Sequence, residues 1–216
     1  MSVAKAAAAK TAIEHLTQQD VLKQRQAAGQ PYLLGVGSGS TIVYFIDYLA
    51  KWLSEGASPR PIIHCVPTSA QTALLLKQRN IEVVPLHGDT VPLDLCVDGA
   101  DEIDAACHLI KGGGACHLRE KEVAVCSRAF WCIADTSKVS THLGEKVRFR
   151  KIKDMQCLTW HLVANRRSTR SITVFGQCCA QSATALPTIS ARFDTCGCIE
   201  FKHITERGCR PQRTDW

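Results

Sequence analysis

Two carboxylates in the middle of the chain have the types and spacing needed for proton-transfer chemistry. Residues 94–102 read DLCVDGADE and place Asp98 and Asp101 just after an apolar run. Carboxylates that crowd together shift one another's pKa values and can divide the work of moving protons. Because Asp and Gly are also ordinary turn residues after a strand, this segment alone is also compatible with a turn that has no catalytic role.

A lysine and a glutamate follow this segment. Residues 109–114 read LIKGGG, which sets Lys111 at the mouth of a glycine-rich turn, and Glu120 lies in the triplet REK on an expected helix. An ammonium group close to a carboxylate can stabilise an oxyanion while the carboxylate moves a proton. A solvated helix face is the commoner explanation of such a charged triplet, but the run of glycines is harder to explain as a plain turn.

A third segment, GSGST at residues 37–41, is suited to binding an anion. Glycines let the backbone turn tightly and present amide hydrogens at the start of a helix, where the helix dipole also favours negative charge. The hydroxyls of Ser38, Ser40 and Thr41 add donors that suit a phosphate. The segment lacks the third glycine of the dinucleotide-binding fingerprint, and a capped strand-to-helix turn is the alternative.

The elements that must position these segments follow from composition and periodicity. Apolar runs predict strands at residues 31–36, 62–66, 81–86, 93–97 and 129–134, and helical composition marks residues 4–16, 42–53 and 70–79. This alternation predicts an α/β fold with a doubly wound, largely parallel, Rossmann-like sheet. Ligands of such sheets bind beyond the carboxyl ends of the strands. The three segments and IADTSK, which ends in Lys138, therefore share one edge of the sheet.

The charge is unevenly distributed along the 216 residues. Residues 1–146 hold 14 Lys and Arg against 15 Asp and Glu, whereas residues 147–216 hold 12 against 5. The basic character therefore belongs to the tail, which also prefers Arg to Lys and loses sustained periodicity, although residues 169–174 could be a strand. Because the tail lacks the aromatic interleaving typical of single-stranded nucleic-acid binding, we expect no nucleic acid as a partner.

The cysteines and the apolar segments bound the class of protein. The 12 cysteines are scattered through apolar runs without a Cys-x-x-Cys pair, so we expect free buried thiols rather than disulfides or metal ligands. No segment approaches the roughly 20 apolar residues of a membrane span, and the alanine-rich start lacks an apolar signal core. The expected location is the cytoplasm, with no membrane and no metal as partner.

Four strings in this order, GVGSGST, DLCVDGADEID, LIKGGGACHLREKEVA and IADTSK, resemble the signature segments of the type A ribose-5-phosphate isomerase family. The resemblance covers about residues 4–146. It implies interconversion of D-ribose 5-phosphate and D-ribulose 5-phosphate in the non-oxidative pentose phosphate pathway, through ring opening and an enediolate, with no metal or organic cofactor. It is also compatible with a homo-oligomeric assembly.

The resemblance also implies a role for each site residue. Glu120 would be the base that moves a proton between C2 and C1, and Lys111 would stabilise the developing oxyanion. Asp98 and Asp101 would contact sugar hydroxyls and assist ring opening. Phosphate binding falls to the hydroxyl loop, with Lys5 as a further candidate. The other implied substrate-binding residues are Ser38, Gly39, Ser40, Thr41, Gly99, Ala100, Gly112, Gly113, Gly114 and Lys138.

Beyond Lys146 the sequence departs from the family, which continues with a proline-containing segment and a small α+β subdomain. We predict a sugar-phosphate isomerase domain over residues 1–146 and an atypical basic tail, disordered or poorly packed, over residues 147–216. The departure resembles a shifted reading frame or an alternative exon more than a diverged subdomain. An active isomerase is the leading function, and the alternatives are an inactive truncated isoform and a sugar-phosphate-sensing regulatory domain.

Overall fold

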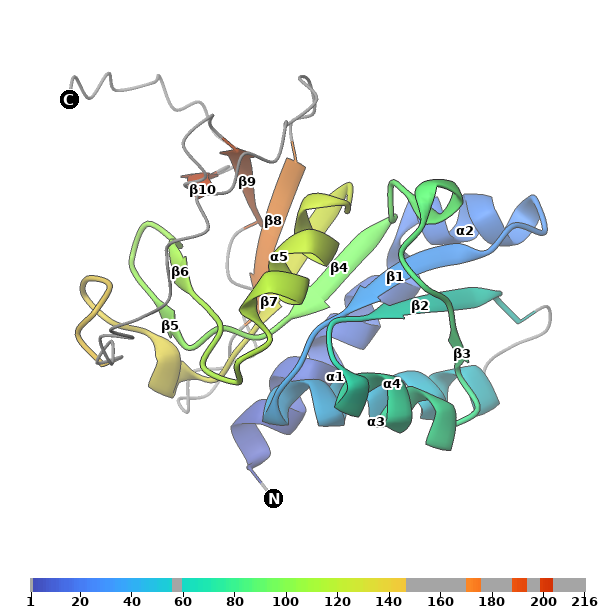
Figure 1. The fold of residues 1–216 in the computed structure, drawn as a ribbon, viewed down its shortest axis with the longest axis horizontal. Helices are drawn as coiled ribbons and strands as arrows, with labels where there is room; N and C mark the ends of the chain where they lie inside the picture. Colours follow the sequence, from blue (N-terminus) through green and yellow to red (C-terminus); the bar gives the residue numbers. More distant parts are fainter. Residues whose placement is uncertain (1, 56–59, 147–169, 176–187, 194–198, 204–216) are drawn as a thin grey trace.

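The computed structural model describes residues 2–55, 60–146, 170–175, 188–193 and 199–203. Its main feature is a sheet with the strand order β10-β9-β8-β7-β4-β1-β2-β3 (Figure 1). The parallel strands are β1 (Tyr32–Val36), β2 (Ile63–Pro67), β3 (Glu82–Val83), β4 (Leu95–Asp98), β7 (Ala129–Ile133) and β8 (Arg170–Phe175). At one edge, β9 (Thr188–Phe193) and β10 (Ile199–His203) continue the sheet in antiparallel orientation.

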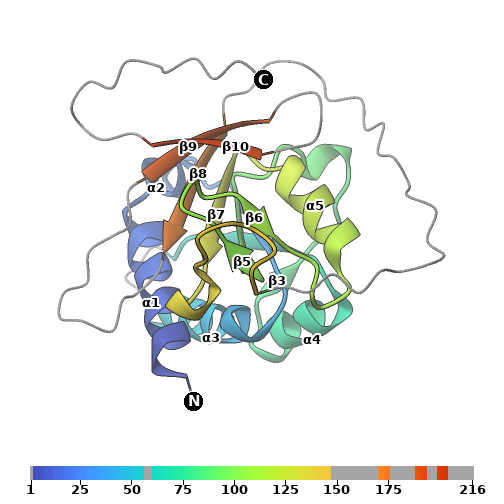
Figure 2. The ribbon, with the colours of Figure 1, turned by 90° about the vertical axis from the view of Figure 1, so that its left-hand side faces the viewer.

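Helices cover both faces of the sheet (Figure 2). One face carries α1 (Val3–Gln18), α3 (Ser40–Glu55) and α4 (Ala70–Gln78), and the other carries α5 (His117–Val125). A further helix, α2 (Asp20–Ala27), leads into β1, and a small antiparallel pair, β5 (Glu102–Ile103) and β6 (Leu109–Ile110), lies beyond the end of β4. Short 3-10 turns occupy Gly88–Thr90 (η1) and Thr136–Lys138 (η2). The fold is the doubly wound α/β arrangement that the sequence predicts.

The two faces of the sheet form two hydrophobic cores because side chains alternate along each strand. Leu34 and Val36 of β1 pack with the residues of α1 and α3, whereas Cys96 of β4 and Cys132 of β7 pack on the other face with Val123 of α5. All of these side chains are buried. Burial on both sides explains why the central strands read as nearly continuous apolar runs.

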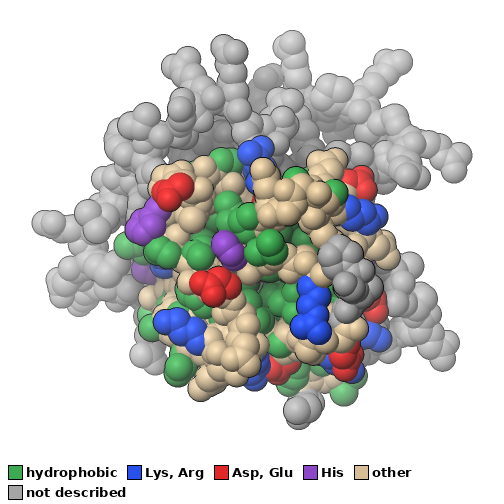
Figure 3. Space-filling view, turned by 90° about the vertical axis from the view of Figure 1, so that its right-hand side faces the viewer, with side chains coloured by type: hydrophobic (Ala, Val, Ile, Leu, Met, Phe, Trp, Pro, Cys, Tyr) green, Lys and Arg blue, Asp and Glu red, His purple; other side chains and the backbone are tan. Residues whose placement is uncertain are grey.

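Several elements differ from the sequence-based expectations. The strand expected at residues 81–86 is reduced to β3, and neither α2 nor the β5–β6 pair was expected. The six cysteines among the described residues are free, but only Cys65, Cys96 and Cys132 are buried as expected, whereas Cys107, Cys116 and Cys126 are partly exposed. None of the described helices is long and apolar enough to cross a membrane. On the face at the β3 edge, acidic, basic and hydrophobic side chains are interspersed (Figure 3).

The strand expected at residues 169–174 is present as β8, in register with β7 from Ala129 opposite Ser171 to Ile133 opposite Phe175. The remainder of the predicted tail, apart from β9 and β10, lies outside the described residues. The division of the chain into residues 1–146 and 147–216 therefore stays a prediction.

Candidate functional site

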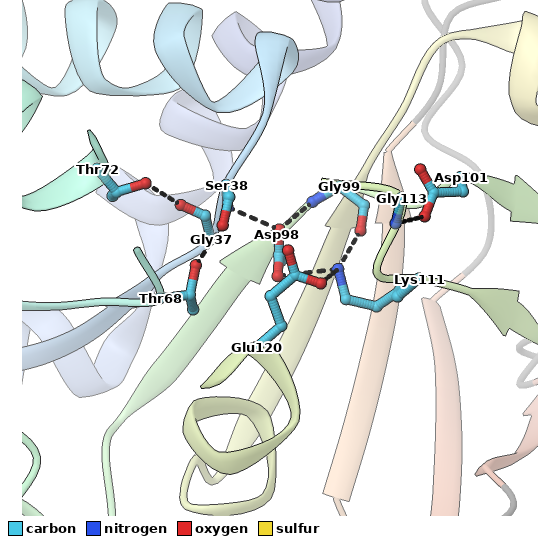
Figure 4. A network of polar contacts seen from close by, with 10 residues as sticks. All are labelled: Gly37, Ser38, Thr68, Thr72, Asp98, Gly99, Asp101, Lys111, Gly113 and Glu120. Atoms are coloured by element: carbon cyan, nitrogen blue, oxygen red, sulfur yellow. Dashed lines mark hydrogen bonds and ion pairs between the residues drawn. The ribbon is translucent and has the colours of Figure 1, made fainter. Parts of the chain in front are cut away.

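Asp98 forms the centre of the site at the carboxyl end of β4 (Figure 4). Its side chain is fully buried, and Oδ1 accepts hydrogen bonds from the amide nitrogens of Ser38 at 3.1 Å and Gly99 at 2.7 Å. A Cβ atom on Gly37 would lie 1.9 Å from this oxygen. Glycine at position 37 is thus what allows the loop after β1 to close over the carboxylate.

Lys111, in the loop after β6, joins Asp98 to Glu120. Its Nζ atom lies 2.9 Å from Asp98 Oδ2 and 3.3 Å from Glu120 Oε2, and it donates a hydrogen bond to the carbonyl oxygen of Gly99 at 2.6 Å. Lys111 thus makes two ion pairs and one hydrogen bond within the cluster. The expectation that an ammonium group lies close to a carboxylate is met twice in one cluster.

Glu120 reaches this cluster from the first turn of α5, and it is 5% exposed. The helix can lie close to the sheet because β1 has glycine at position 35, where a Cβ atom would lie 2.6 Å from Cγ1 of Val123. Val123 follows Glu120 by one turn, so the close contact at Gly35 sets the height of the glutamate above the end of β4.

Burial and charge shift the ionisation of the cluster in opposite ways. Burial raises the pKa of Asp98, and the neighbouring Glu120 carboxylate raises it further against the lowering effect of Lys111. Burial alone would lower the pKa of Lys111, but Asp98 and Glu120 together hold that pKa above its ordinary value. With both carboxylates ionised, the cluster carries one excess negative charge in a water-poor site. It is therefore suited to accepting a proton next to a fixed positive charge.

Asp101 holds the glycine turn instead of contacting Lys111. Its Oδ2 atom accepts a hydrogen bond from the Gly113 amide at 2.7 Å, and a Cβ atom on Gly113 would lie 2.5 Å from Oδ1. Gly112 has φ +98, a conformation that favours glycine, and a Cβ atom there would lie 2.5 Å from Cβ of His117. Figure 4 shows Asp101 beyond Gly99 and Gly113 from the Asp98 cluster.

The loop at residues 37–39 is held by the segment that follows β2. Ser38 Oγ lies 2.7 Å from Thr68 Oγ1, and Thr72 Oγ1 donates a hydrogen bond to the carbonyl oxygen of Gly37 at 2.7 Å. Ser69 caps α4 by accepting a hydrogen bond from the Thr72 amide at 3.0 Å. Thr68 and Thr72 are buried, and neither was among the site residues predicted from the sequence.

A second group of polar residues gathers where α3 begins. Ser40 is the first residue of α3, and its Oγ atom accepts a hydrogen bond from Lys5 Nζ of α1 at 2.8 Å. Nearby, Asp135 caps η2 by accepting a hydrogen bond from the Ser137 amide at 2.9 Å. Although burial opposes the change, hydrogen bonds from the amide and the hydroxyl of Ser137 and the charges of Lys5 and Lys138 lower the pKa of Asp135. Lys5 therefore contacts the first residue of α3 directly, and Lys138 ends the turn that Asp135 caps.

Comparisons with known proteins show which proteins this part of the chain resembles. Residues 64–151 match the family described as ribose 5-phosphate isomerase A (phosphoriboisomerase A). A probable ribose 5-phosphate isomerase of Caenorhabditis elegans is 44% identical over 126 residues, which cover 56% of this chain and 49% of that protein. Ribose-5-phosphate isomerase A of Xylella fastidiosa strain M12 is 44% identical over 146 residues, covering 67% and 59%. Over this part, the chain is similar to the type A ribose-5-phosphate isomerase family.

Solved structures of the type A ribose-5-phosphate isomerase family share the fold. The enzyme from Methanocaldococcus jannaschii superposes with a TM-score of 0.55 at 34% identity, over 66% of this chain and 56% of that one. The enzyme from Neisseria gonorrhoeae gives 0.52 at 39% identity, over 65% and 54%. The chain spans about half to three-fifths of the length of the curated relatives it matches. The family match ends at residue 151, close to the change in composition after Lys146.

Proposed function

We propose that this chain is an aldose-ketose isomerase that interconverts D-ribose 5-phosphate and D-ribulose 5-phosphate in the non-oxidative pentose phosphate pathway. The observation that carries the proposal is the position of Lys111 between Asp98 and Glu120, at 2.9 Å and 3.3 Å. Removing a proton from the carbon next to a carbonyl needs a carboxylate base and a nearby positive charge. The cluster supplies both at the ligand-binding edge of the sheet.

In the proposed reaction, Glu120 removes the proton from C2 of the open-chain sugar, and the electron pair of that bond forms the C1–C2 double bond of an enediolate. Lys111 stabilises the negative oxygen that develops. Glu120 then returns the proton to C1, while the hydroxyl proton on O2 is transferred to the negative O1, so that C2 becomes the carbonyl and C1 carries a hydroxyl group. Asp98 assists the preceding ring opening by relaying a proton from the anomeric hydroxyl to the ring oxygen, a role that its raised pKa suits.

We place the phosphate of the substrate at the start of α3, with Ser38 to Thr41, Lys5 and Lys138 as its ligands. The hydrogen bond from Lys5 to Ser40 at 2.8 Å and the effect of both lysines on Asp135 support this placement. A relative with 35% identity and a TM-score of 0.55 is described in complex with phospho-erythronic acid, a phosphorylated compound. Asp101 and the backbone of residues 99–100 and 112–114 are proposed to contact the sugar.

Substitution of Glu120 by glutamine tests the base. Glutamine keeps the size of the side chain but cannot accept the C2 proton, so kcat should fall by about 10²–10⁴-fold while KM changes little. Glu122→Gln is the matched control, because Glu122 lies on the same helix and its side chain pairs with Arg119 at 3.1 Å instead of with Lys111. Full activity of Glu120→Gln, assayed with ribose 5-phosphate and no added metal, would refute the assignment.

The inactive truncated isoform remains the second candidate, because the chain covers only 49% to 59% of the first two relatives and the family match ends at residue 151. Such a protein would bind sugar phosphate without isomerising it, so calorimetric binding together with absent turnover would favour it. We also propose that the protein is cytoplasmic, which cell fractionation would test. We propose a homo-oligomer, which light scattering would test, and a domain boundary at Lys146, which limited proteolysis would test.

A further inference from the structure

Glu102 is a buried carboxylate that the proposed reaction does not use. It follows Asp101 directly, lies on β5, and has no exposed surface. Its Oε1 atom accepts hydrogen bonds from the amides of Glu145 at 2.9 Å and Lys146 at 3.3 Å, and Oε2 accepts one from the Gly144 amide at 3.1 Å. A buried charge of this kind is stable only when hydrogen bonds satisfy it, and here the donors come from a distant loop.

That loop, residues 136–146, is also closed by its own side chains. Glu145 Oε2 accepts hydrogen bonds from the amide of Thr141 at 2.9 Å and from its hydroxyl at 3.0 Å. Lys146 Nζ donates to the carbonyl oxygens of Ser137, at 2.9 Å, and Val139. Lys146 therefore connects the end of the loop to the two residues that flank Lys138.

The start of the loop is attached to the same strand. Val139 forms an isolated parallel bridge with Ile103, and the Ser140 amide donates a hydrogen bond to the Ile103 carbonyl oxygen at 2.8 Å. Both ends of residues 139–146 are thus fixed to Glu102 and Ile103, one and two residues beyond Asp101. The position of Lys138 depends on the strand that begins where the Asp98–Asp101 segment ends.

We propose that Glu102 is a positioning residue that fixes Lys138 relative to the Asp98 cluster, and so sets the distance between the phosphate site and the reacting carbons. The inference rests on the proposed function for the identity of the ligand. A carboxylate suits the task because both of its oxygens accept hydrogen bonds from consecutive amides. In glutamine an NH2 group replaces one of these oxygens. This group cannot accept a hydrogen bond, so one of the backbone amides would lose its acceptor.

The experiment is a double-mutant cycle on the full chain, with binding of ribose 5-phosphate and of inorganic phosphate measured by calorimetry. Glu102→Gln should weaken ribose 5-phosphate binding by about tenfold, a size usual for one member of a hydrogen-bond network. In the Lys138→Met background the same substitution should have almost no further effect. Inorganic phosphate does not reach from the phosphate site to the Asp98 cluster, so its binding should be weakened less. Glu82→Gln, an exposed carboxylate on β3, is the matched control.

A second variant covers the case in which Glu102→Gln does not fold. Lys146 is exposed, and Lys146→Met removes its contacts to Ser137 and Val139 without opening the core. It should also weaken ribose 5-phosphate binding through Lys138, whereas Lys23→Met, an exposed lysine on α2, should not.

The outcomes separate this inference from the proposed function. Losses that simply add in the double variant, or unchanged affinity in both Glu102→Gln and Lys146→Met, would overturn it. Binding that shows the expected coupling without any isomerisation by the unsubstituted chain would support the positioning role and contradict the proposed activity. If the unsubstituted chain binds neither ligand, both are wrong.

Discussion

At the residue scale, the buried cluster contains more negative than positive charge, and Lys111 stabilises the two buried carboxylates. Asp98 and Glu120 have 1% and 6% of their side-chain surface exposed, and Lys111 lies within 3.3 Å of both. Removing one partner of a buried ion pair leaves an uncompensated charge, which typically costs about 3–5 kcal/mol. The cluster should therefore respond to the loss of Lys111 through stability as well as through activity.

We predict that Lys111→Met makes stability depend on pH. The pKa of Asp98 is already raised above its ordinary 3.8 in the folded state, and loss of the cation raises it further. Because the folded state then holds a proton that the unfolded state releases, the free energy of unfolding falls as pH rises from about 4 through the folded pKa. Urea unfolding should show a variant about 3–5 kcal/mol less stable than the original chain at pH 8 and much closer to it at pH 5.

Adding Asp98→Asn to Lys111→Met provides the control, since asparagine carries no charge. The double variant should recover much of the stability lost at pH 8. An equal loss at pH 5 and pH 8 in the single variant would show that packing, and not charge, explains the effect.

A second residue-scale prediction concerns Gly37. A Cβ atom there would lie 1.9 Å from Asp98 Oδ1, so Gly37→Ala must displace the carboxylate or the loop that covers it. Overpacking of this kind costs about 1–3 kcal/mol, and we expect thermal unfolding at a lower temperature together with reduced isomerisation. Gly88→Ala is the control, because no atom lies within 4 Å of the added Cβ, and it should be nearly neutral.

The residues of the site could be predicted better than their partners. Asp98 and Lys111 stood out because they are charged groups beside glycines, and Glu120 was predicted through the resemblance of its segment to the family. The structure brings these three together. The contact of Asp101 with Gly113 could not be predicted, since a short-range turn and a substrate ligand use the same residue types. Glu102 was hidden for a physical reason: its partners are backbone amides more than 40 residues away, which no side-chain pattern records.

At the element scale, the position of α5 decides whether Glu120 can reach Lys111. The helix packs against β1 at Gly35, where a Cβ atom would lie 2.6 Å from Val123 Cγ1 and 3.1 Å from Cβ of Cys96. Side chains elsewhere in a close-packed core cannot give way freely. Glycine in the middle of a buried strand, which ordinarily weakens the strand, is explained by this contact.

We predict that Gly35→Ala moves α5 away from the sheet and lowers kcat by about 10-fold to 100-fold, because small displacements of catalytic groups have effects of that size. Val123→Ala in the same chain removes the clashing methyl groups and should restore part of the activity. The measurement is kcat for both variants beside Val123→Ala alone. No recovery in the double variant would mean that the strand, through Cys96, is disturbed instead of the helix.

The elements themselves followed from the sequence where the local pattern was long and regular. The strands near residues 31–36, 62–66, 93–97 and 129–134 are present as β1, β2, β4 and β7. The β5–β6 pair was missed because each of its strands has only two residues, too few to show a period. It exists because Glu102 and Ile103 find partners beyond the strand, in the loop that carries Lys138.

At the scale of the whole molecule, the question is what residues 147–216 contribute. The chain covers 59% of the Xylella fastidiosa relative, and the change from mixed to basic composition after Lys146 comes five residues before the family match ends at residue 151. In the structure β8 covers one edge of β7, the strand whose Cys132 lies opposite Asp98 of β4. Of the described elements after residue 146, β8 therefore lies next to β7, one strand away from the Asp98 strand β4.

We predict that a chimera of residues 1–146 with the C-terminal part of that relative isomerises ribose 5-phosphate faster, and unfolds at a higher temperature, than the full chain. The reason is that β7 needs a well-fitting neighbour at its outer edge, because an edge that is poorly covered exposes unpaired backbone groups and apolar surface. Hydrogen exchange at Ala129–Ile133 reports this directly, because amides of a well-covered strand open only with global unfolding. The chimera should show slower exchange there. If both proteins exchange at the same rate and the full chain is equally active, residues 147–216 already complete the fold, and the composition change after Lys146 marks divergence of a working subdomain.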